Sequence, residues 1–265
     1  MMEKMIFGRY IPGNSFVHQM DARSKLIFVF AFIVVVFLAN NMVTYSLLIG
    51  FTLFAILASR IRIYFLVNGL KPVLILMIFT FALHVLFTKE GDLLWQWGFL
   101  EVYEGGLKQG IFISIRFLVL VFMTSILTLT TSPISITDGV ETLLNPLKRF
   151  KIPVHELALM MSISLRFIPT LMDETDKIMK AQMARGSDLS AGPLMSRLKA
   201  VIPLLVPLFV SSFKRAEDLA TAMEVRGYRG GEGRTRYRQL KWDKGDTFAL
   251  VTLVVLAGLL LFFRN

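Results

Sequence analysis

Residues 110–131 read GIFISIRFLVLVFMTSILTLTT, and this stretch decides the class of fold. Arg116 is its single charged residue. A helix needs about 20 mainly apolar residues to cross the hydrocarbon core of a bilayer. Because no water reaches the backbone there, a crossing segment must satisfy its own hydrogen bonds as a helix. The stretch therefore predicts a membrane-spanning helix.

Other stretches of the chain have the same apolar character: residues 26–39, 42–58, 70–87 and 247–263. The first of them is short for a crossing segment, and Asn40–Asn41 separates it from the second. This pair predicts a tight helical hairpin with a polar tip. Together with residues 110–131, these stretches predict an all-α polytopic membrane protein with about five transmembrane helices.

The composition agrees with a membrane protein and excludes several other classes. Hydrophobic residues make up 55% of the chain and charged residues 18%, whereas soluble domains carry about 25% charged residues. These values exclude a disordered chain, a collagen and a coiled coil. The chain has no cysteine, which excludes disulfides, thiolate nucleophiles and cysteine-ligated metal centres.

The charges between the spans predict the orientation of the chain. Residues 1–25 hold four Lys or Arg, and the link 59–71 holds three with no acid. The loop 88–108 holds four acids against two lysines. Because basic residues collect in cytoplasmic loops, we expect a cytoplasmic amino terminus. Anionic headgroups explain the basic residues of 228–238 without a nucleic-acid partner.

The sequence predicts three parts. Residues 1–131 form a membrane domain, residues 132–246 a cytoplasmic region of long amphipathic helices, and residues 247–265 a terminal transmembrane helix. Apolar residues recur at helical spacing from Val154 to Ala184 and from about Leu204 to Val225. Pro203 and Pro207 are expected to mark the entry of the second helix.

Chemistry that an enzyme or ion-coupled carrier needs is missing from the predicted spans. Residues 26–87, residues 105–137 and the last span contain no Asp or Glu, although ionisable groups within the membrane are what such functions require. His84 is expected to be hydrogen-bonded or solvated near the outer interface, and Arg116 to extend to the outer headgroups. There is no phosphate-binding loop and no histidine pair at metal-ligand spacing. We therefore expect no cofactor, no metal and no catalytic activity.

The two long helices are predicted to end alike, with KAQMARG at 180–186 and TAMEVRG at 221–227. One Arg-Gly end is an ordinary helix terminus, because arginine suits the helix dipole and glycine the left-handed cap. Two such ends on matched helices predict two equivalent receptors. A guanidinium pairs with a carboxylate through two parallel hydrogen bonds. The candidate docking residues are Ala184, Arg185, Gly186, Val225, Arg226 and Gly227.

These motifs give the chain a resemblance to a known family over essentially its whole length. It resembles the transmembrane T component of energy-coupling factor transporters, a branch of the ATP-binding-cassette (ABC) importers. The resemblance rests on GRYIPGNSFVHQMDARSK at 8–25, on SLRFIP at 164–169 and on both Arg-Gly motifs. The family usually has Pro where this chain has Ala22, and often Ala where it has Val225.

The resemblance implies a non-catalytic subunit in the plasma membrane of a prokaryotic cell that works with several partners. Two cytosolic ATPases would dock on Arg185 and Arg226, a small membrane S component would bind a vitamin or micronutrient, and this chain would couple them. The implied contacts with the S component lie on the apolar faces of the long helices: Met160, Met161, Leu165, Ile168, Met172, Phe209 and Phe213. Packing between the two helices explains the same stripes equally well.

Two other functional classes compete with the coupling subunit. The permease subunit of a conventional ABC importer holds its own substrate path and usually presents one coupling helix per chain, which the paired motifs disfavour. A membrane enzyme or carrier is disfavoured by the missing carboxylates.

Overall fold

A computed structural model describes residues 10–97, 100–186, 193–230 and 239–264. The chain forms two compact units, which are described separately here. The larger unit comprises residues 7–143 and 239–265, and the smaller unit comprises residues 1–6 and 144–238. Both are built almost entirely of helices, so the chain is an all-α polytopic membrane protein, as predicted.

The larger unit holds most of the elements: α1 (Phe16–Gln19), α2 (Ala22–Val36), α3 (Met42–Ser59), α4 (Ile63–Phe87), β1 (Leu93–Trp97), β2 (Leu100–Tyr103), α5 (Glu104–Thr130), α6 (Pro133–Leu144) and α9 (Lys244–Phe262). The smaller unit holds the short 3-10 helix η2 (Asn145–Phe150) and two long helices, α7 (Val154–Ala184) and α8 (Leu194–Val225).

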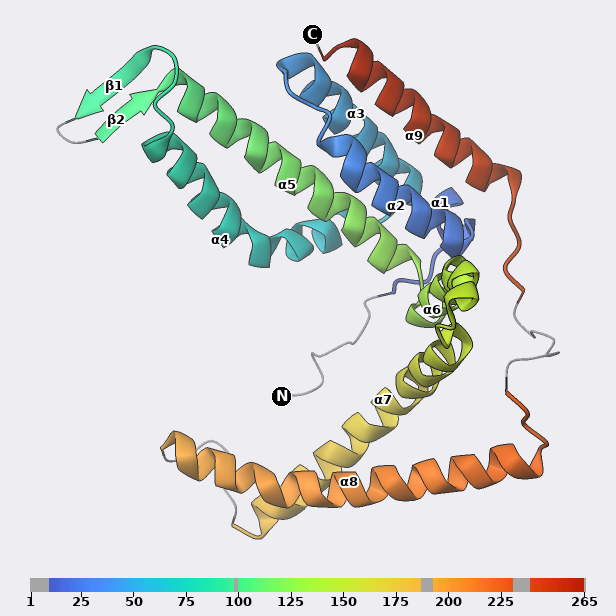
Figure 1. The fold of residues 1–265 in the computed structure, drawn as a ribbon. Coiled ribbons are helices and arrows are strands. Elements are labelled where there is room, and N and C mark those ends of the chain that lie inside the picture. The colour runs from blue at the N-terminus through green and yellow to red at the C-terminus, as the bar shows by residue number, and fades with distance from the viewer. Residues whose placement is uncertain (1–9, 98–99, 187–192, 231–238, 265) are drawn as a thin grey trace. The chain divides into compact units, whose positions relative to one another are not determined.

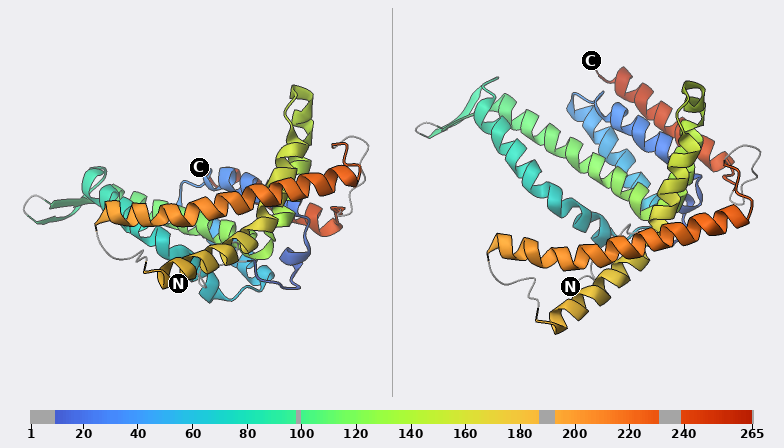
Figure 2. Two further views of the ribbon diagram at one scale, coloured as in Figure 1. Left: turned by 90° about the horizontal axis from the view of Figure 1, so that it is seen from below. Right: turned by 60° about the horizontal axis from the view of Figure 1, so that its bottom comes forward.

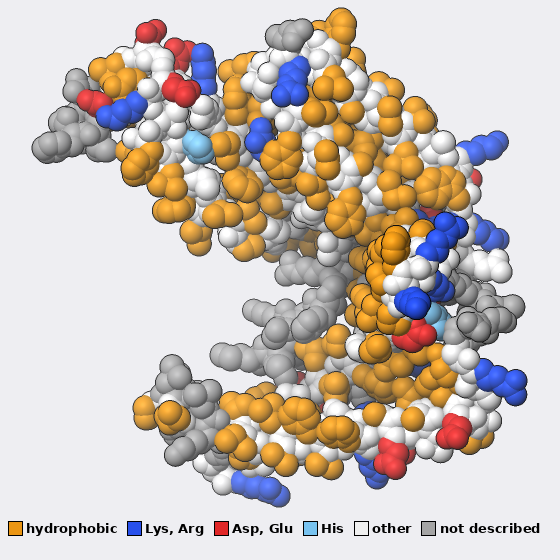
Figure 3. Space-filling model, in the orientation of Figure 1, with side chains coloured by type: hydrophobic (Ala, Val, Ile, Leu, Met, Phe, Trp, Pro, Cys, Tyr) orange, Lys and Arg blue, Asp and Glu red, His pale blue; other side chains and the backbone are white. Residues whose placement is uncertain are grey.

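Helices long and apolar enough to cross a membrane are α3, α4, α5, α7 and α9 among the residues described. Four of them overlap the predicted spans. The predicted span 26–39 falls on α2, which is 15 residues long. α7 has the lowest mean hydropathy of the set, 1.2, because its apolar residues form stripes among charged ones, and its cytoplasmic location stays a prediction. Figure 3 shows hydrophobic side chains over much of the visible surface of the larger unit.

The polar tip between α2 and α3 is built as the sequence predicts. Asn41 caps α3, because its Oδ1 accepts the Thr44 N–H at 2.9 Å while the Thr44 hydroxyl oxygen accepts the Asn41 N–H at 3.0 Å. The side-chain amides of Asn40 and Asn41 donate to the carbonyls of Arg264 and Phe263 at 2.8 and 2.6 Å. The tip therefore satisfies carbonyls that the end of α9 leaves without a helical partner.

The core of the larger unit lies among α2, α3, α5 and α9. Its fully buried side chains include Phe32, Leu48, Val119 and Leu260. α4 packs along α5 (Figure 1). This approach requires glycine at position 106, because a Cβ there would lie 2.8 Å from the His84 carbonyl oxygen. Small residues that let backbones approach closely are typical of helix packing in membranes.

A β-hairpin occupies the acidic loop, for which the sequence analysis predicted no particular structure. β1 and β2 pair antiparallel with Trp97 opposite Leu100. The Lys89 ammonium lies 3.0 Å from a carboxylate oxygen of Glu101. The all-α class still holds, because this hairpin is the single sheet among the residues described.

α8 begins about ten residues earlier than predicted, at Leu194, so the prediction that prolines mark its entry is wrong. Pro203 and Pro207 lie inside the helix. A proline inside a helix removes one backbone hydrogen bond and disfavours the helix, but strong helix formers in the turns before it can offset that cost. Leu, Met, Arg, Lys and Ala, all strong helix formers, predominate in the preceding turns.

A buried carboxylate ties the start of α9 to the start of α2. Asp246 is 1% exposed. Its Oδ1 accepts the Asp21 N–H at 2.9 Å and the Ser24 hydroxyl, and its Oδ2 accepts the Asp243 N–H at 2.8 Å. Together with the contacts at the tip, this means that α2 and α9 run parallel, with both starts at one end of the unit.

The stretch Asp21–Lys25, at the end of the amino-terminal motif 8–25, supplies most of this polar cluster. The buried Lys25 ammonium donates to the carbonyls of Thr130 and His18 at 3.1 and 3.3 Å, which joins α1, α2 and α5. Burial raises the pKa of the Asp21 carboxyl, but hydrogen bonds from Arg23 and the charges of Arg23 and Lys25 outweigh it and hold that pKa below the ordinary value of an aspartate. Asp21 is therefore ionised at neutral pH.

Replacement of Asp246 by Ala is expected to destabilise the larger unit by at least about 3 kcal/mol, because several buried donors lose their acceptor and each costs about 1–3 kcal/mol. Thermal unfolding of the full chain in detergent measures the loss. Lys244→Ala, at an exposed position in the same first turn of α9, is the control and should unfold near the parent temperature. Equal unfolding temperatures for both variants would contradict the structural role of Asp246.

Candidate functional site

α7 ends in a backbone cap that favours glycine. Arg185 is the C-cap residue, and its N–H lies 3.2 and 3.1 Å from the carbonyl oxygens of Ala181 and Gln182. The Gly186 N–H donates to the Met183 carbonyl at 3.0 Å, and Gly186 adopts φ +85°. Glycine takes this left-handed conformation at no steric cost. The predicted end of the first long helix is confirmed.

α8 ends in the same way. Arg226 is its C-cap residue, and Gly227 adopts φ +70°. The Gly227 N–H donates to the Glu224 carbonyl at 2.9 Å and the Tyr228 N–H to the Met223 carbonyl at 3.0 Å. These two bonds form a Schellman motif. The predicted end of the second long helix is also confirmed.

Both Arg-Gly ends present their side chains to the surroundings. Ala184, Arg185, Arg226 and Val225 are exposed, with Val225 82% exposed. Neither guanidinium has an ion pair or side-chain hydrogen bond with the residues that the structure describes. The two ends lie apart in every view of Figures 1 and 2. Each end therefore presents guanidinium N–H donors that can form two parallel hydrogen bonds with a carboxylate on another chain.

One part of the apolar stripes packs between α7 and α8. A groove of about 330 Å³ is lined by Ile163, Phe167 and Leu171 from α7 and by Ala216, Leu219 and Met223, among others, from α8. The Arg215 guanidinium, which also lines it, lies 2.8 Å from a carboxylate oxygen of Glu174. For these residues, packing between the helices accounts for the stripe. The sequence analysis missed the Glu174–Arg215 pair, because the partners are 41 residues apart.

The seven residues expected to contact an S component lie outside the lining of that groove. Met160, Met161, Phe209 and Phe213 are exposed, and Leu165, Ile168 and Met172 are half-buried. Figure 3 shows hydrophobic side chains along part of α8. The two helices thus use one set of apolar residues for each other and leave another set open.

Arg116 is bound by other groups of the larger unit, and its expected extension to the outer headgroups stays a prediction. Its Nη2 donates to the Tyr45 hydroxyl at 2.9 Å and lies 3.5 Å from the Ala39 carbonyl oxygen. Its guanidinium carbon lies 5.0 Å from the ring centre of Phe37. The sequence cannot reveal these contacts, because they join α5 to the first turn of α3 and to the connection between α2 and α3. Arg116 is therefore held by the protein itself.

Replacement of Arg116 by Ala is expected to leave the order of substrate preference unchanged, because the contacts of Arg116 are structural. Uptake of several substrates through one fixed S component measures this order. Tyr45→Phe, which removes one partner of the guanidinium, is the matched variant and should behave alike. A changed order of preference in the Arg116 variant would assign this residue to a substrate path.

No group of three or more His, Asp or Glu side chains is placed to hold a metal ion within the described ranges. Most of the basic cluster at 228–238, namely residues 231–238, lies outside the described residues.

Comparison with known proteins identifies the family. Residues 13–237 match a family model described as cobalt transport protein (CbiQ). The chain is also 63% identical over 264 residues, all of both chains, to the energy-coupling factor transporter transmembrane protein EcfT of Bacillus subtilis (strain 168). The chain belongs to the family of energy-coupling factor transporter transmembrane proteins. Its identity to the EcfT proteins of Macrococcus caseolyticus (strain JCSC5402) and Listeria innocua serovar 6a (strain ATCC BAA-680 / CLIP 11262) is 56% over the full length of each chain.

As a member of the EcfT family, the chain is the energy-coupling T component of a membrane transporter. The alternative, a conventional importer permease, is not favoured by matches that cover the whole chain. The resemblance inferred from the Arg-Gly ends and the amino-terminal motif is confirmed.

Proposed function

We propose that the chain carries conformational work from two cytosolic ABC-type ATPases to a small integral-membrane S component that binds a vitamin or micronutrient. The chain itself is non-catalytic in this proposal, and it needs no cofactor. ATP hydrolysis resides in the two ATPases, and substrate recognition resides in the S component.

The observation that carries the proposal is the pair of matched helix ends. Each presents an exposed arginine, Arg185 or Arg226, next to a glycine in the left-handed conformation. The backbone hydrogen bonds of each cap fix the direction in which the chain leaves the helix. Two similar ends suit two similar ATPases, each with an acidic groove that accepts one guanidinium. Ala184 and Val225 would fill the apolar part of each groove.

The exposed apolar residues of α7 and α8 support the proposed contact with the S component. Met160, Met161, Phe209 and Phe213 are large, hydrophobic and exposed, whereas other residues line the groove between the helices. Methionine adapts its shape to different partners, which suits a surface that receives an S component.

The parallel course of α2 and α9 supports the proposed orientation. If the amino terminus is cytoplasmic, both helices begin at the cytoplasmic face of the plasma membrane and end at the outer face. The basic residues Arg23, Lys25 and Lys244 then lie at the cytoplasmic ends of these helices, as the positive-inside rule requires.

Purification of the tagged full chain from its native membrane tests the proposal. We expect two ATPase chains and one small membrane protein to co-purify in stoichiometric amounts. A preparation that transports substrate with no ATPase chain bound would refute the proposed function.

A further inference from the structure

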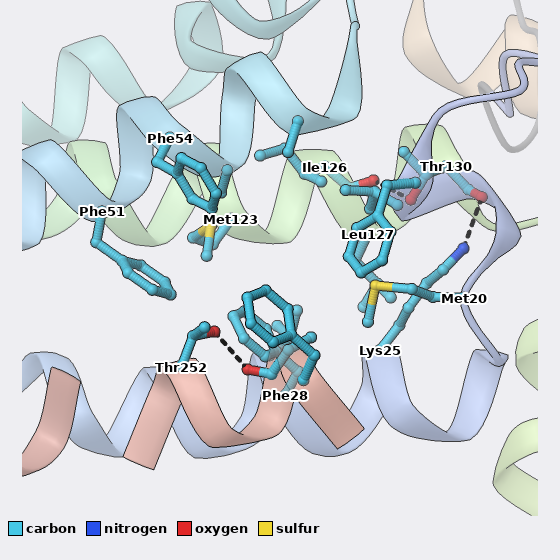
Figure 4. Close-up of a pocket in the computed structure, with 17 residues that line it drawn as sticks. Met20, Lys25, Phe28, Phe51, Phe54, Met123, Ile126, Leu127, Thr130 and Thr252 are labelled. Atoms are coloured by element: carbon cyan, nitrogen blue, oxygen red, sulfur yellow. Dashed lines mark hydrogen bonds between the residues drawn. The ribbon is translucent and has the colours of Figure 1, made fainter. Parts of the chain in front are cut away.

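The larger unit contains an apolar cavity of about 340 Å³ among α1, α2, α3, α5 and α9 (Figure 4). Its floor is formed by side chains from the buried core, including Val29, Met123 and Ile126. Its rim includes Phe54 and Phe248, which are 61% and 60% exposed. The cavity is therefore open to the surroundings of the helices on one side.

The polar groups along the cavity are satisfied inside the protein. The Lys25 ammonium donates to the Thr130 carbonyl at 3.1 Å, and the Thr130 and Thr252 hydroxyls donate to backbone carbonyls of their own helices at 2.7 Å. Figure 4 shows the Lys25 and Thr252 bonds as dashed lines. What Lys25 presents to the cavity is its hydrocarbon stem. An apolar cavity of this size holds no stable water and takes an apolar ligand.

The helices that surround the cavity indicate which apolar ligand can reach it. α3, α5 and α9, which form much of its wall, are long and apolar enough to cross the membrane. Phe54 and Phe248 on the rim therefore face hydrocarbon chains. An acyl chain of a bilayer lipid is present there at high concentration and matches the lining chemically.

The positive charge at one end of the cavity favours a lipid with an anionic headgroup. Ala58 lines the cavity near the end of α3, and the exposed Arg60 and Arg62 follow directly. Lys244, four residues before the rim residue Phe248, is exposed at the start of α9. Of the nearby acids, Asp21 and Asp246 are buried and bound internally. The Asp243 carboxylate caps the start of α9.

We propose that this cavity holds one acyl chain of an anionic phospholipid, with the headgroup at Arg60 and Lys244. The lipid would fill the space among α2, α3 and α9 close to the cluster around Asp246. One Lys or Arg near an anionic headgroup contributes about fivefold in affinity, so we expect about a fivefold or larger preference for an anionic lipid over a neutral lipid with the same chains.

Quenching of tryptophan fluorescence by brominated lipids tests the proposal in the full chain, assembled with its partner subunits in vesicles. Phe54→Trp places a reporter on the rim, and Leu57→Trp places one at a 75% exposed position outside the lining. The signal of the parent chain is subtracted from both. The probes are phosphatidylglycerol and phosphatidylcholine that carry the same brominated chains.

We expect phosphatidylglycerol to quench the Phe54→Trp reporter at several-fold lower mole fraction than phosphatidylcholine, and both lipids to quench the Leu57→Trp reporter equally. Adding Ala58→Phe to the rim reporter fills the cavity and should abolish the preference, whereas adding Leu57→Phe should keep it. The pair Arg60→Asn and Lys244→Gln should lower the preference without filling the cavity. Asn suits position 60, because Arg60 adopts φ 54°.

Several outcomes would overturn the proposal. Equal quenching of the rim reporter by both lipids would show that no anionic lipid is selected. A preference that survives both Ala58→Phe and the Arg60/Lys244 pair would place the selected lipid elsewhere. A rim reporter that neither lipid quenches in the assembled complex would show that a protein segment of a partner occupies the cavity instead.

Discussion

Replacing Arg185 and Arg226 together by Glu is expected to abolish co-purification of the ATPases with the chain. Both side chains are exposed, and the caps around them are made by backbone hydrogen bonds. The substitutions therefore leave the helix ends folded and reverse the charge that meets an acidic groove. Removing one partner of a desolvated charge pair costs about 2–5 kcal/mol, so each single variant should weaken binding by about 30-fold or more.

Stoichiometry after affinity purification, and dissociation constants for the purified ATPases, measure this effect. Lys180→Glu and Arg229→Glu are matched controls, because they change the net charge equally at exposed positions near the same helix ends. The controls should keep both ATPases bound. If the double variant still co-purifies with both ATPases in full amount, docking through these arginines is wrong.

The sequence predicted the helix ends and the polar tip well because local rules govern them. Gly186 and Gly227 stand where a left-handed cap is needed, and only the residues within one turn decide that. The tip at Asn40–Asn41 follows from two polar residues between two apolar runs. The spanning helices follow from length and composition, which need no knowledge of neighbours.

What the sequence did not predict depends on neighbours or on competing local rules. The prediction of a helix start at Pro203 and Pro207 is wrong, because strong helix formers precede them and α8 begins at Leu194. The Arg116–Tyr45 bond and the Glu174–Arg215 pair join distant parts of the chain. The division of the α7 and α8 stripes into groove-lining and open residues depends on the rotation of each helix. Periodicity alone does not give that rotation.

Substitutions that keep assembly but degrade the helix ends are expected to separate ATP hydrolysis from uptake. Arg185→Lys and Arg226→Lys keep the charge and lose the planar fork, so attraction survives while the geometry of the contact is lost. Gly186→Val and Gly227→Val place a β-branched residue at φ +85° and +70°. A Cβ at either glycine meets nothing within 4 Å, so the strain of about 1–3 kcal/mol falls on the backbone of the cap alone.

The measurement pairs ATPase turnover with substrate uptake on the same reconstituted preparation. Gly230→Val is the matched control, because Gly230 has φ +85° and open space around it but lies beyond the end of α8. If strain alone were harmful, this control would lose uptake as well. We expect Gly230→Val to transport substrate at the parent level. The four variants at the helix ends should keep most ATPase turnover and lose most uptake. The reason is that a bent or loosened cap no longer moves α7 or α8 together with the ATPase. Uptake at the parent level in all four variants would show that these helix ends do not transmit the motion.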